Sequence, residues 1–486
     1  MALTTEQAMQ QGVASHREGN LQEAERLYRA ILQTQPGHPD ANHNLGLIAL
    51  AANAAEAALP LFKTALEINP AVEQFWLSYI AVLIRLGLLE PAKGVLERAQ
   101  DLGFKIEKLE PLNRKLASTT NKAPVSEVAA AEVYRTLGVA LKELGRLDEA
   151  EASYRKAIAL KPDYIEAHFN LGNTLKKLDK LSEAEESYSH AIDLQPDFVP
   201  ALMNRWELLF NRGEFETALK DADCCNNQIS RLRSLESLYA LGRNEEIFQR
   251  IADQSGLDNE NLHVAAFAAF IAAVEKKNSA HGFCNNPLDF IHISNVSAHH
   301  ENPDIFIVDV IEELRNIRTE GDPENKSTYK GFQTPSGINL FAAPSGNVAQ
   351  LKSIIVAELV RFYEKSQNES CSYIQKWPRQ KNFHGWHVIL KQQGHQTPHI
   401  HVDGWLSGVV YLQVVPSLDK NEGAIEFGLN SPNYSADGLP TTVHQPAAGD
   451  IVFFPSSLHH RTIPFSTDTE RIVVAFDLMP DSAATE

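Results

Sequence analysis

Residues 137–162 read LGVALKELGRLDEAEASYRKAIALKP, and residues 171–196 read LGNTLKKLDKLSEAEESYSHAIDLQP, so the same pattern returns 34 residues further along the chain. Each stretch begins with Leu-Gly, carries Ala, an aromatic residue and a second Ala at fixed distances, and ends in Pro. The apolar positions have helical spacing, and Pro ends a helix because its ring cannot continue one. The pattern predicts pairs of antiparallel helices whose small residues allow close approach.

Looser copies of the pattern lie earlier in the chain, with Leu45-Gly46, Ala58, Phe62, Ala65 and Pro70 in one copy and Gly12, Gly19, Ala24, Tyr28 and Pro36 in another. The signature resembles the tetratricopeptide repeat. The resemblance implies an all-α solenoid, and such solenoids mostly present a concave surface to another polypeptide. We therefore expect a protein or peptide ligand on the repeat surface. Repeats that only mediate self-association, or cap the second domain, are the alternative.

Breaks in the repeat phase predict the domain boundaries. We expect a first block of repeats over residues 1–108 and a second block over 127–255. Between them, residues 109–126 contain two prolines and a polar run, which predicts a linker or irregular insert. A helical connector over 256–284 then leads to a C-terminal domain over 285–486.

The bulk composition is that of a soluble multidomain protein. A chain of 486 residues is too long for one core, and a formal charge of −18 argues against nucleic-acid binding, which needs clustered Lys and Arg. The four cysteines show no metal-binding spacing, which favours a reducing compartment. No signal peptide is evident, and the longest apolar run, residues 264–274, is too short to cross a bilayer. We therefore expect a cytoplasmic protein without a membrane partner.

The sequence pattern of the C-terminal region differs from that of the repeats, because short β-segments alternate with turns. The expected strands are His387–Lys391, Trp405–Val415, Ala424–Gly428, Asp450–Phe454 and Arg471–Leu478. Two helices are expected before them, at Asp304–Ile317 and Val348–Tyr363. Many short strands at this spacing favour a double-stranded β-helix, or jelly roll, with flanking helices.

Metal-binding residue types lie on these expected strands. His401, Asp403 and His460 are two imidazoles and one carboxylate, the ligand set of the facial triad that holds non-haem Fe(II) with open coordination positions. His399 shares the side of the extended segment that carries His401 and Asp403, because side chains alternate along a strand. Arg471 supplies a cation that a dicarboxylate co-substrate requires.

The motifs around these residues resemble the 2-oxoglutarate- and Fe(II)-dependent oxygenases. The matching segments are His399-Ile400-His401, Ser407-Gly408-Val409-Val410-Tyr411, Phe454-Pro455-Ser456-Ser457-Leu458-His459-His460 with Pro464, and Arg471-Ile472. The resemblance implies that His401, Asp403 and His460 bind Fe(II). It further implies that Arg471 binds 2-oxoglutarate, with Tyr411 as a second candidate contact. His399 is the alternative third ligand in place of Asp403, and His460 is preferred to its neighbour His459.

The expected function is that of a 2-oxoglutarate- and Fe(II)-dependent dioxygenase, a hydroxylase acting on a protein or peptide that the repeats recruit. The first alternative is a repeat-based binding scaffold whose jelly roll is catalytically inactive. The second is a cupin-type metal enzyme that does not use 2-oxoglutarate, in which Arg471 has no role in the reaction.

Overall fold

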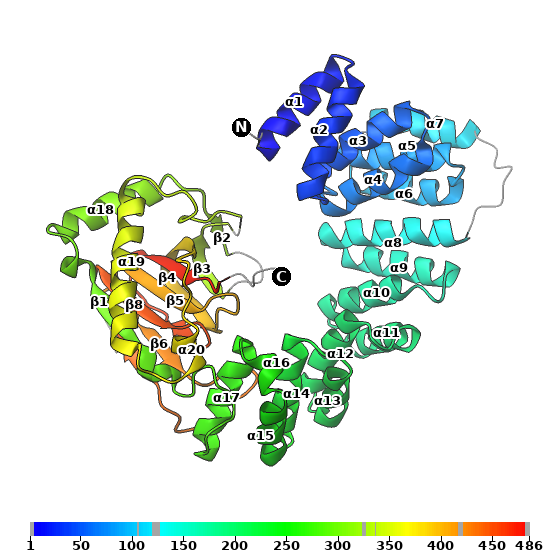
Figure 1. The fold of residues 1–486 in the computed structure, drawn as a ribbon. Coiled ribbons are helices and arrows are strands. Elements are labelled where there is room, and N and C mark those ends of the chain that lie inside the picture. Colours follow the sequence, from blue (N-terminus) through cyan, green and yellow to red (C-terminus); the bar gives the residue numbers. More distant parts are fainter. Residues whose placement is uncertain are drawn as a thin grey trace. The chain divides into compact units, whose positions relative to one another are not determined.

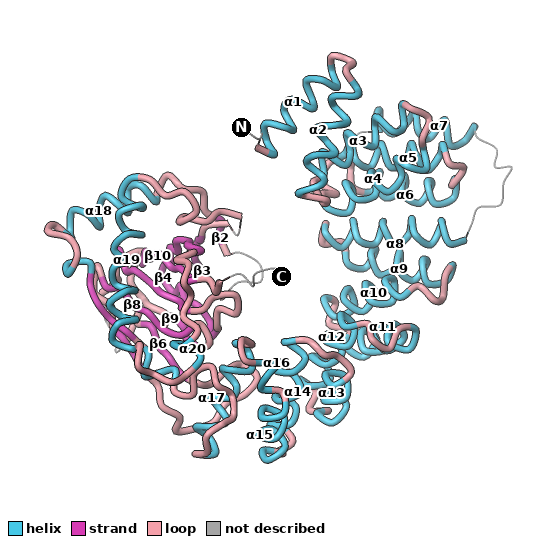
Figure 2. Tube along the Cα trace, viewed as in Figure 1, coloured by secondary structure: helices cyan, strands magenta, loops and turns pink. Residues whose placement is uncertain are grey.

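The chain forms two compact units, Met1–Arg212 and Gly213–Glu486, in a computed structural model (Figure 1). The structure describes residues 4–104, 106–118, 127–322, 327–335, 337–416 and 421–481. In the described part of the chain, the first unit contains helices and turns, and the strands lie in the second unit (Figure 2). The predicted class, a helical solenoid followed by a jelly roll, is confirmed.

The first unit is a succession of helices, most of them joined into antiparallel pairs by tight turns. Its helices are α1 Thr5–Arg17, α2 Leu21–Thr34, α3 Pro39–Ala51, α4 Ala55–Ile68, α5 Glu73–Arg85, α6 Leu89–Asp101, α7 Ile106–Ser118, α8 Glu127–Glu143, α9 Leu147–Leu160, α10 Ile165–Lys177, α11 Leu181–Leu194 and α12 Val199–Asn211. The pairs α1/α2, α3/α4, α8/α9 and α10/α11 correspond to the repeats predicted from the sequence.

A glycine of the first helix packs directly on an aromatic ring of the second in each of these pairs. A Cβ atom at Gly138 would lie 2.6 Å from the Tyr154 ring, and one at Gly172 would lie 2.5 Å from the Tyr188 ring. Both tyrosines are fully buried. The glycine is therefore required because the ring of the second helix occupies the space of a side chain.

Helix α7 departs from the expectation of an irregular segment over residues 109–126. The structure places a helix at Ile106–Ser118 despite Pro111 in its interior, whereas 119–126 lie outside the described residues. Leu109 is fully buried, and Leu112 packs against the same core. Burial of these leucines offsets the backbone hydrogen bond that the proline removes, which explains why the prediction was wrong here.

The second unit begins with further helices and continues into the sheet. Its helices are α13 Phe215–Asp223, α14 Gln228–Ala240, α15 Asn244–Asp253, α16 Ser255–Asp258, α17 Leu262–Glu275, α18 Pro303–Leu314, α19 Gly346–Ser366 and α20 Ser372–Gln375, with 3-10 turns η1 Pro287–Phe290 and η2 Val296–Ala298. Its strands are β1 His292–Asn295, β2 Glu320–Gly321, β3 Thr328–Gln333, β4 Phe383–His399, β5 Leu406–Gln413, β6 Ile425–Gly428, β7 Thr442–His444, β8 Asp450–Pro455, β9 His459–Thr462 and β10 Arg471–Leu478.

The strands form one antiparallel sheet that curls over on itself. Its order is β1-β8-β5-β10-β4-β9-β6-β7, and β3 pairs with β4 beside it. The long strand β4 makes the curl, because its first half pairs with β10 and its end pairs with β9. Between the two halves, Gln393 has a φ of 63°, and its N–H donates to the carbonyl of Phe465 at 2.7 Å. This kink redirects β4 from one side of the curl to the other.

Side-chain alternation gives the sheet two apolar faces. Along β10, Ile472, Val474 and Phe476 pack with α18 and α19 in the core outside the curl. Val473 points the other way, into a core that it shares with Tyr411 and Phe454. The metal-site candidates therefore lie on the inner face of the curl, away from the face that the two helices cover.

Helices α14, α15 and α17 share the inner core with the sheet. The rings of Phe267 and Phe270 on α17 lie 4.9 and 4.6 Å from the ring of Tyr434, which follows β6. Tyr239 of α14 donates its hydroxyl to the carbonyl of Ser435 at 3.1 Å. These contacts explain why the division between units falls after Arg212, whereas the boundaries predicted from the sequence lie at 255 and 284.

Candidate metal centre

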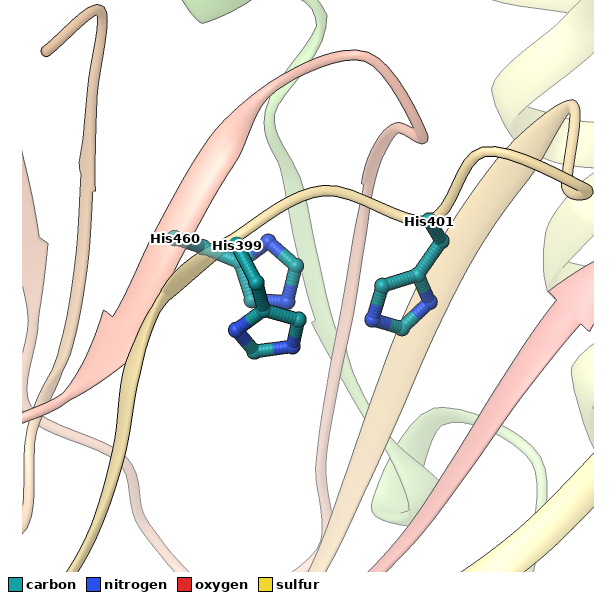
Figure 3. Close-up of side chains that lie close together, drawn as sticks. All are labelled: His399, His401 and His460. Atoms are coloured by element: carbon teal, nitrogen blue, oxygen red, sulfur yellow. The ribbon is translucent and has the colours of Figure 1, made fainter. Parts of the chain in front are cut away.

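Three histidines converge at the open end of the curled sheet. His399 is the last residue of β4 and pairs across the sheet with His460 of β9, and His401 follows two residues later. One ring nitrogen of each histidine lies within 4.8 Å of the corresponding nitrogens of the other two. The three rings point into a common space (Figure 3). Three imidazoles at this separation are a ligand set for a divalent transition metal.

Hydrogen bonds at Nδ1 orient all three rings. Nδ1 of His399 lies 2.7 Å from the carbonyl of Thr397, and Nδ1 of His460 lies 3.1 Å from the carbonyl of Leu458. Nδ1 of His401 lies 2.6 Å from a carboxylate oxygen of Asp477. Because carbonyl and carboxylate oxygens only accept, each Nδ1 carries the proton and each Nε2 is the ring nitrogen with the lone pair, that of His399 lying 3.4 Å from the Ser327 hydroxyl. The arrangement presents three Nε2 atoms suited to metal binding.

Burial keeps two of these imidazoles neutral. Burial, with a smaller contribution from the neighbouring His401, lowers the pKa of His399 to about 3. Burial also lowers the pKa of His460 well below its ordinary value. A neutral imidazole is the form that binds a metal, so neither residue has to lose a proton at neutral pH before it can act as a ligand.

Asp477 belongs to the centre, although sequence reasoning did not select it. Its carboxylate accepts hydrogen bonds from His401 and from the hydroxyl of Ser407 at 2.7 Å. Ser407 in turn lies 2.8 Å from the hydroxyl of Ser456. The sequence could have indicated Asp477, because it is the one carboxylate in the largely apolar strand β10. It lies an even number of residues from Arg471 and therefore on the same, inner face of the sheet.

The structure leaves Asp403 outside the cluster of three histidines. Strand β4 ends at His399, and a turn over residues 402–403 follows, so the extended segment expected to align Asp403 with the histidines stops too early. Asp403 is exposed on that turn and lines the pocket in front of the histidines. Its role as a ligand stays a prediction. His459 faces away from the cluster, towards Tyr434, at 5.9 Å between rings.

Arg471 and Tyr411 form a second polar site inside the curled sheet. The Arg471 guanidinium lies over the Tyr411 ring, 4.9 Å from its centroid. Arg471 is 2% exposed, and within the described chain its Nε and Nη1 have no hydrogen-bond partner and no carboxylate forms an ion pair with it. The Tyr411 hydroxyl is buried beside Arg471, and this burial raises the pKa of Tyr411 to about 12 against the lowering effect of the guanidinium. A buried guanidinium with unpaired N–H donors is costly, and a bound anion would reduce that cost.

A pocket of about 460 Å³ opens onto the histidines. Its lining includes His399, His401 and Asp477 together with Trp386 and Asp403. The Trp386 ring lies 5.5 Å from the His401 ring and forms part of the pocket lining beside it. The pocket gives a second molecule access to the centre from solvent.

Family models match both parts of the chain, the helical repeats and the C-terminal sheet domain. The family model described as "Putative 2OG-Fe(II) oxygenase" matches residues 384–477, a segment that runs from β4 to Asp477 and contains the three histidines and Arg471. Tetratricopeptide repeat models match residues 11–73, 138–179 and 165–198. The expected architecture is confirmed.

Solved structures similar to the chain include proteins whose descriptions name TPR domains. YrrB, described as a TPR protein with an unusual peptide-binding site, is 21% identical, with 42% of this chain and 92% of that chain covered and a TM-score of 0.20. PilF of Pseudomonas aeruginosa is 19% identical (48% and 96% covered, TM-score 0.27). The TPR2AB domain of yeast Sti1, solved as a complex with pHSP90, is 18% identical (51% and 96% covered, TM-score 0.21). A search of curated proteins gives no match.

Among the described residues, no helix is both long enough and apolar enough to cross a bilayer.

Proposed function

We propose that the second unit is a 2-oxoglutarate- and Fe(II)-dependent dioxygenase that hydroxylates a protein or peptide recruited by the repeats. The observation that carries the proposal is the convergence of three imidazoles whose Nδ1 atoms are all tied to oxygen acceptors. Bound Fe(II), with 2-oxoglutarate and oxygen, supplies the oxidising chemistry for C–H hydroxylation. The residues of the chain hold and orient these groups.

His399, His401 and His460 hold the metal in this proposal, and Asp477 holds the His401 ring in position. An anionic acceptor at Nδ1 makes an imidazole a stronger ligand and limits its rotation. The three residues come from two paired strands and the turn after one of them, so the sheet fixes their spacing. Asp403 is exposed on the turn after His401 and lines the pocket, outside the three-histidine cluster.

Arg471 neutralises the far carboxylate of 2-oxoglutarate in this proposal. Its Nε and Nη1 are buried N–H donors on two edges of the guanidinium that a bound anion can use, and burial excludes water that would screen the charge. The Tyr411 hydroxyl adds a donor on the same side of the curled sheet. An anion there also compensates the cost of keeping an unpaired guanidinium in an apolar core.

The test is an anaerobic titration of the full chain with Fe(II) and 2-oxoglutarate, following the visible absorbance of the ternary complex. Arg471→Lys keeps the charge but removes the two-pronged donor geometry, so we expect 2-oxoglutarate affinity to fall at least tenfold, about 1.4 kcal/mol, while Fe(II) affinity is retained. Arg155→Lys, at an exposed position of the repeats, is the matched control and leaves both affinities unchanged. Unaltered 2-oxoglutarate affinity in Arg471→Lys contradicts the assignment.

A metal enzyme that does not use 2-oxoglutarate is the second candidate, and it is favoured because the described residues add no carboxylate to the three-histidine cluster. Imidazole ligands suit zinc, copper and nickel as well as iron. The same titration separates the candidates, because this enzyme binds metal without any spectral response to 2-oxoglutarate. A chain that binds neither metal nor 2-oxoglutarate is the binding scaffold with an inactive jelly roll.

The repeats offer one described pocket suited to a polar peptide. It has a volume of about 340 Å³ and lies between α9, α10 and α11, with Arg155, His168, Glu183 and His190 in its lining. The His168 and His190 rings lie 5.4 Å apart. Charged side chains and imidazole rings in one groove are suited to binding a polypeptide segment. They support substrate recruitment as the role of the first unit.

A further inference from the structure

Two of the four cysteines come together away from the metal centre. Cys284 follows α17 in the segment that leads to β1, and Cys371 immediately precedes α20. Two backbone hydrogen bonds join these segments, from the Ser372 N–H to the Gly282 carbonyl at 2.8 Å and from the Tyr373 N–H to the Phe283 carbonyl at 2.9 Å. The Cys284 and Cys371 side chains are near enough for each to be the leading influence on the pKa of the other, and both are free thiols.

The two thiols have different surroundings. Cys284 is 3% exposed and lies in the core between the sheet and α19. Cys371 is partly exposed and lines a pocket of about 440 Å³ together with Lys365 and Glu369. A small oxidant from solvent therefore reaches Cys371 first, while Cys284 lies behind it as the only described cysteine in position to react with it.

The pKa values of the two thiols also differ, with that of Cys371 lowered and that of Cys284 raised. The hydrogen bond from the Cys284 thiol lowers the pKa of Cys371 to about 7, although burial opposes the shift. The same hydrogen bond, together with burial, raises the pKa of Cys284 well above its ordinary value. A large fraction of Cys371 is then thiolate at neutral pH, and the thiolate is the nucleophile in thiol oxidation.

We propose that Cys284 and Cys371 are a peroxide-reactive pair that forms a reversible intramolecular disulfide. In the first step the Cys371 thiolate attacks one oxygen of hydrogen peroxide, the O–O bond breaks, and the products after protonation are a sulfenic acid and water. In the second step the Cys284 sulfur attacks the Cys371 sulfur, the S–O bond breaks, and a second water leaves with the Cys284 proton. Two thiols and one peroxide thus give one disulfide and two waters.

The disulfide ties the segment after α17 to the start of α20, and neither thiol belongs to the metal centre. The inference therefore does not rest on the proposed oxygenase function. Phe283 and Tyr373, which flank the pair, have ring centroids 5.6 Å apart, and both contact Trp405. The backbone on either side of the pair is thus held in place by packing.

The experiment treats the metal-free full chain with hydrogen peroxide, blocks remaining thiols by alkylation and maps peptides by mass spectrometry without reduction. We expect a linked peptide pair containing Cys284 and Cys371, two hydrogens lighter than the separate peptides, which dithiothreitol separates. Cys371 should be alkylated several-fold faster than Cys224 before oxidation, since a pKa near 7 gives roughly tenfold more thiolate at neutral pH than an ordinary thiol.

Replacing each cysteine of the pair in turn tests the order of the two steps. In Cys284→Ser, the sulfenic acid at Cys371 should persist and be trapped by dimedone, whereas in Cys371→Ser the peroxide should leave Cys284 reduced. Cys224→Ser is the matched control and should form the linked peptide as the wild-type chain does. Peroxide treatment of the wild-type chain that yields no Cys284–Cys371 peptide, or that links either residue to Cys224 or Cys225 instead, overturns the inference.

Discussion

Single hydrogen bonds decide which nitrogen each histidine of the cluster presents to a metal. Two of the Nδ1 acceptors are backbone carbonyls, which no substitution can remove, whereas the third is the Asp477 side chain. Asp477 also accepts from Ser407, so its carboxylate is held from two sides. His401 is therefore the proposed ligand whose geometry can be altered without replacing any of the three histidines.

Asp477→Asn should weaken metal binding while leaving all three imidazoles in place. The amide is nearly isosteric but carries no charge and can turn its NH₂ towards Nδ1, which would favour the wrong tautomer of His401. Loss of such a supporting carboxylate typically costs about 10–100-fold in metal affinity. Competition titration with a metal-chelating dye measures the effect. Asp481→Asn, at an exposed position near the chain end, is the control, and equal affinities in both variants would remove Asp477 from this role.

The identity of the third ligand can be decided by paired substitutions. We expect His399→Ala, His401→Ala and His460→Ala each to lower Fe(II) affinity by at least about 100-fold, because each removes one of three Nε2 donors. Asp403→Ala and His459→Ala should change it by less than about threefold. Equilibrium metal titration of the five variants is the measurement. Strong loss in Asp403→Ala with retained binding in His399→Ala would restore the facial triad of two histidines and one carboxylate.

At the level of elements, close helix pairing in the repeats depends on glycines that face rings. Glycine in a helix interior is normally unfavourable by about 0.5–1 kcal/mol relative to alanine, so its use there needs a compensating reason. That reason is the Tyr188 ring 2.5 Å from the Cβ position of Gly172. By contrast, Gly94 in α6 has its nearest neighbour, the Tyr134 ring, at an ordinary contact distance of 3.5 Å.

Gly172→Ala should therefore destabilise the α10/α11 pair by about 1–3 kcal/mol, because the new methyl group forces the helices or the Tyr188 ring apart. Gly94→Ala is the matched control and should be neutral or stabilising by up to about 1 kcal/mol, since its helix gains propensity without a clash. Hydrogen exchange of the α10 and α11 amides in the full chain reports the opening free energy. Equal protection in both variants would mean that the repeat tolerates a side chain at Gly172.

At the level of the whole molecule, α13–α17 belong to the same compact unit as the sheet although the repeat pattern extends into them. The inner core of the curled sheet contains Leu235 of α14 and Phe267 of α17 next to Tyr411 and Phe454. A large apolar side chain contributes on the order of 1.5–3 kcal/mol when fully buried. Several such side chains come from these helices, so the sheet depends on them for part of its stability.

A chain that begins at Gly213 should therefore fold and bind Fe(II) with the affinity of the full chain, whereas one that begins at Asn285 should be unstable or aggregate. The shorter chain exposes Tyr434 and the neighbouring apolar surface that α17 covers. Circular dichroism melting and metal titration compare the two. A stable, metal-binding chain from Asn285 would show that the helices are not part of the domain core.

The chain from Gly213 also tests the role of the repeats. It should turn over 2-oxoglutarate slowly without substrate but lose stimulation by a lysate of the source cell, because the first unit no longer raises the local substrate concentration. Equal stimulation of succinate release in both chains would contradict recruitment by the repeats.

The sequence by itself determined the repeats, the strand pattern and most of the polar candidates, because local periodicity specifies an element and the face on which each residue lies. The expected strand Arg471–Leu478 has the same bounds as β10, and the structure brings the predicted His401 and His460 together. Only the tertiary structure decided that His399 joins them while Asp403 does not, because the end of β4 and its pairing with β9 depend on segments far apart in the chain. It also decided that Asp477 anchors His401, since that contact joins residues 76 positions apart.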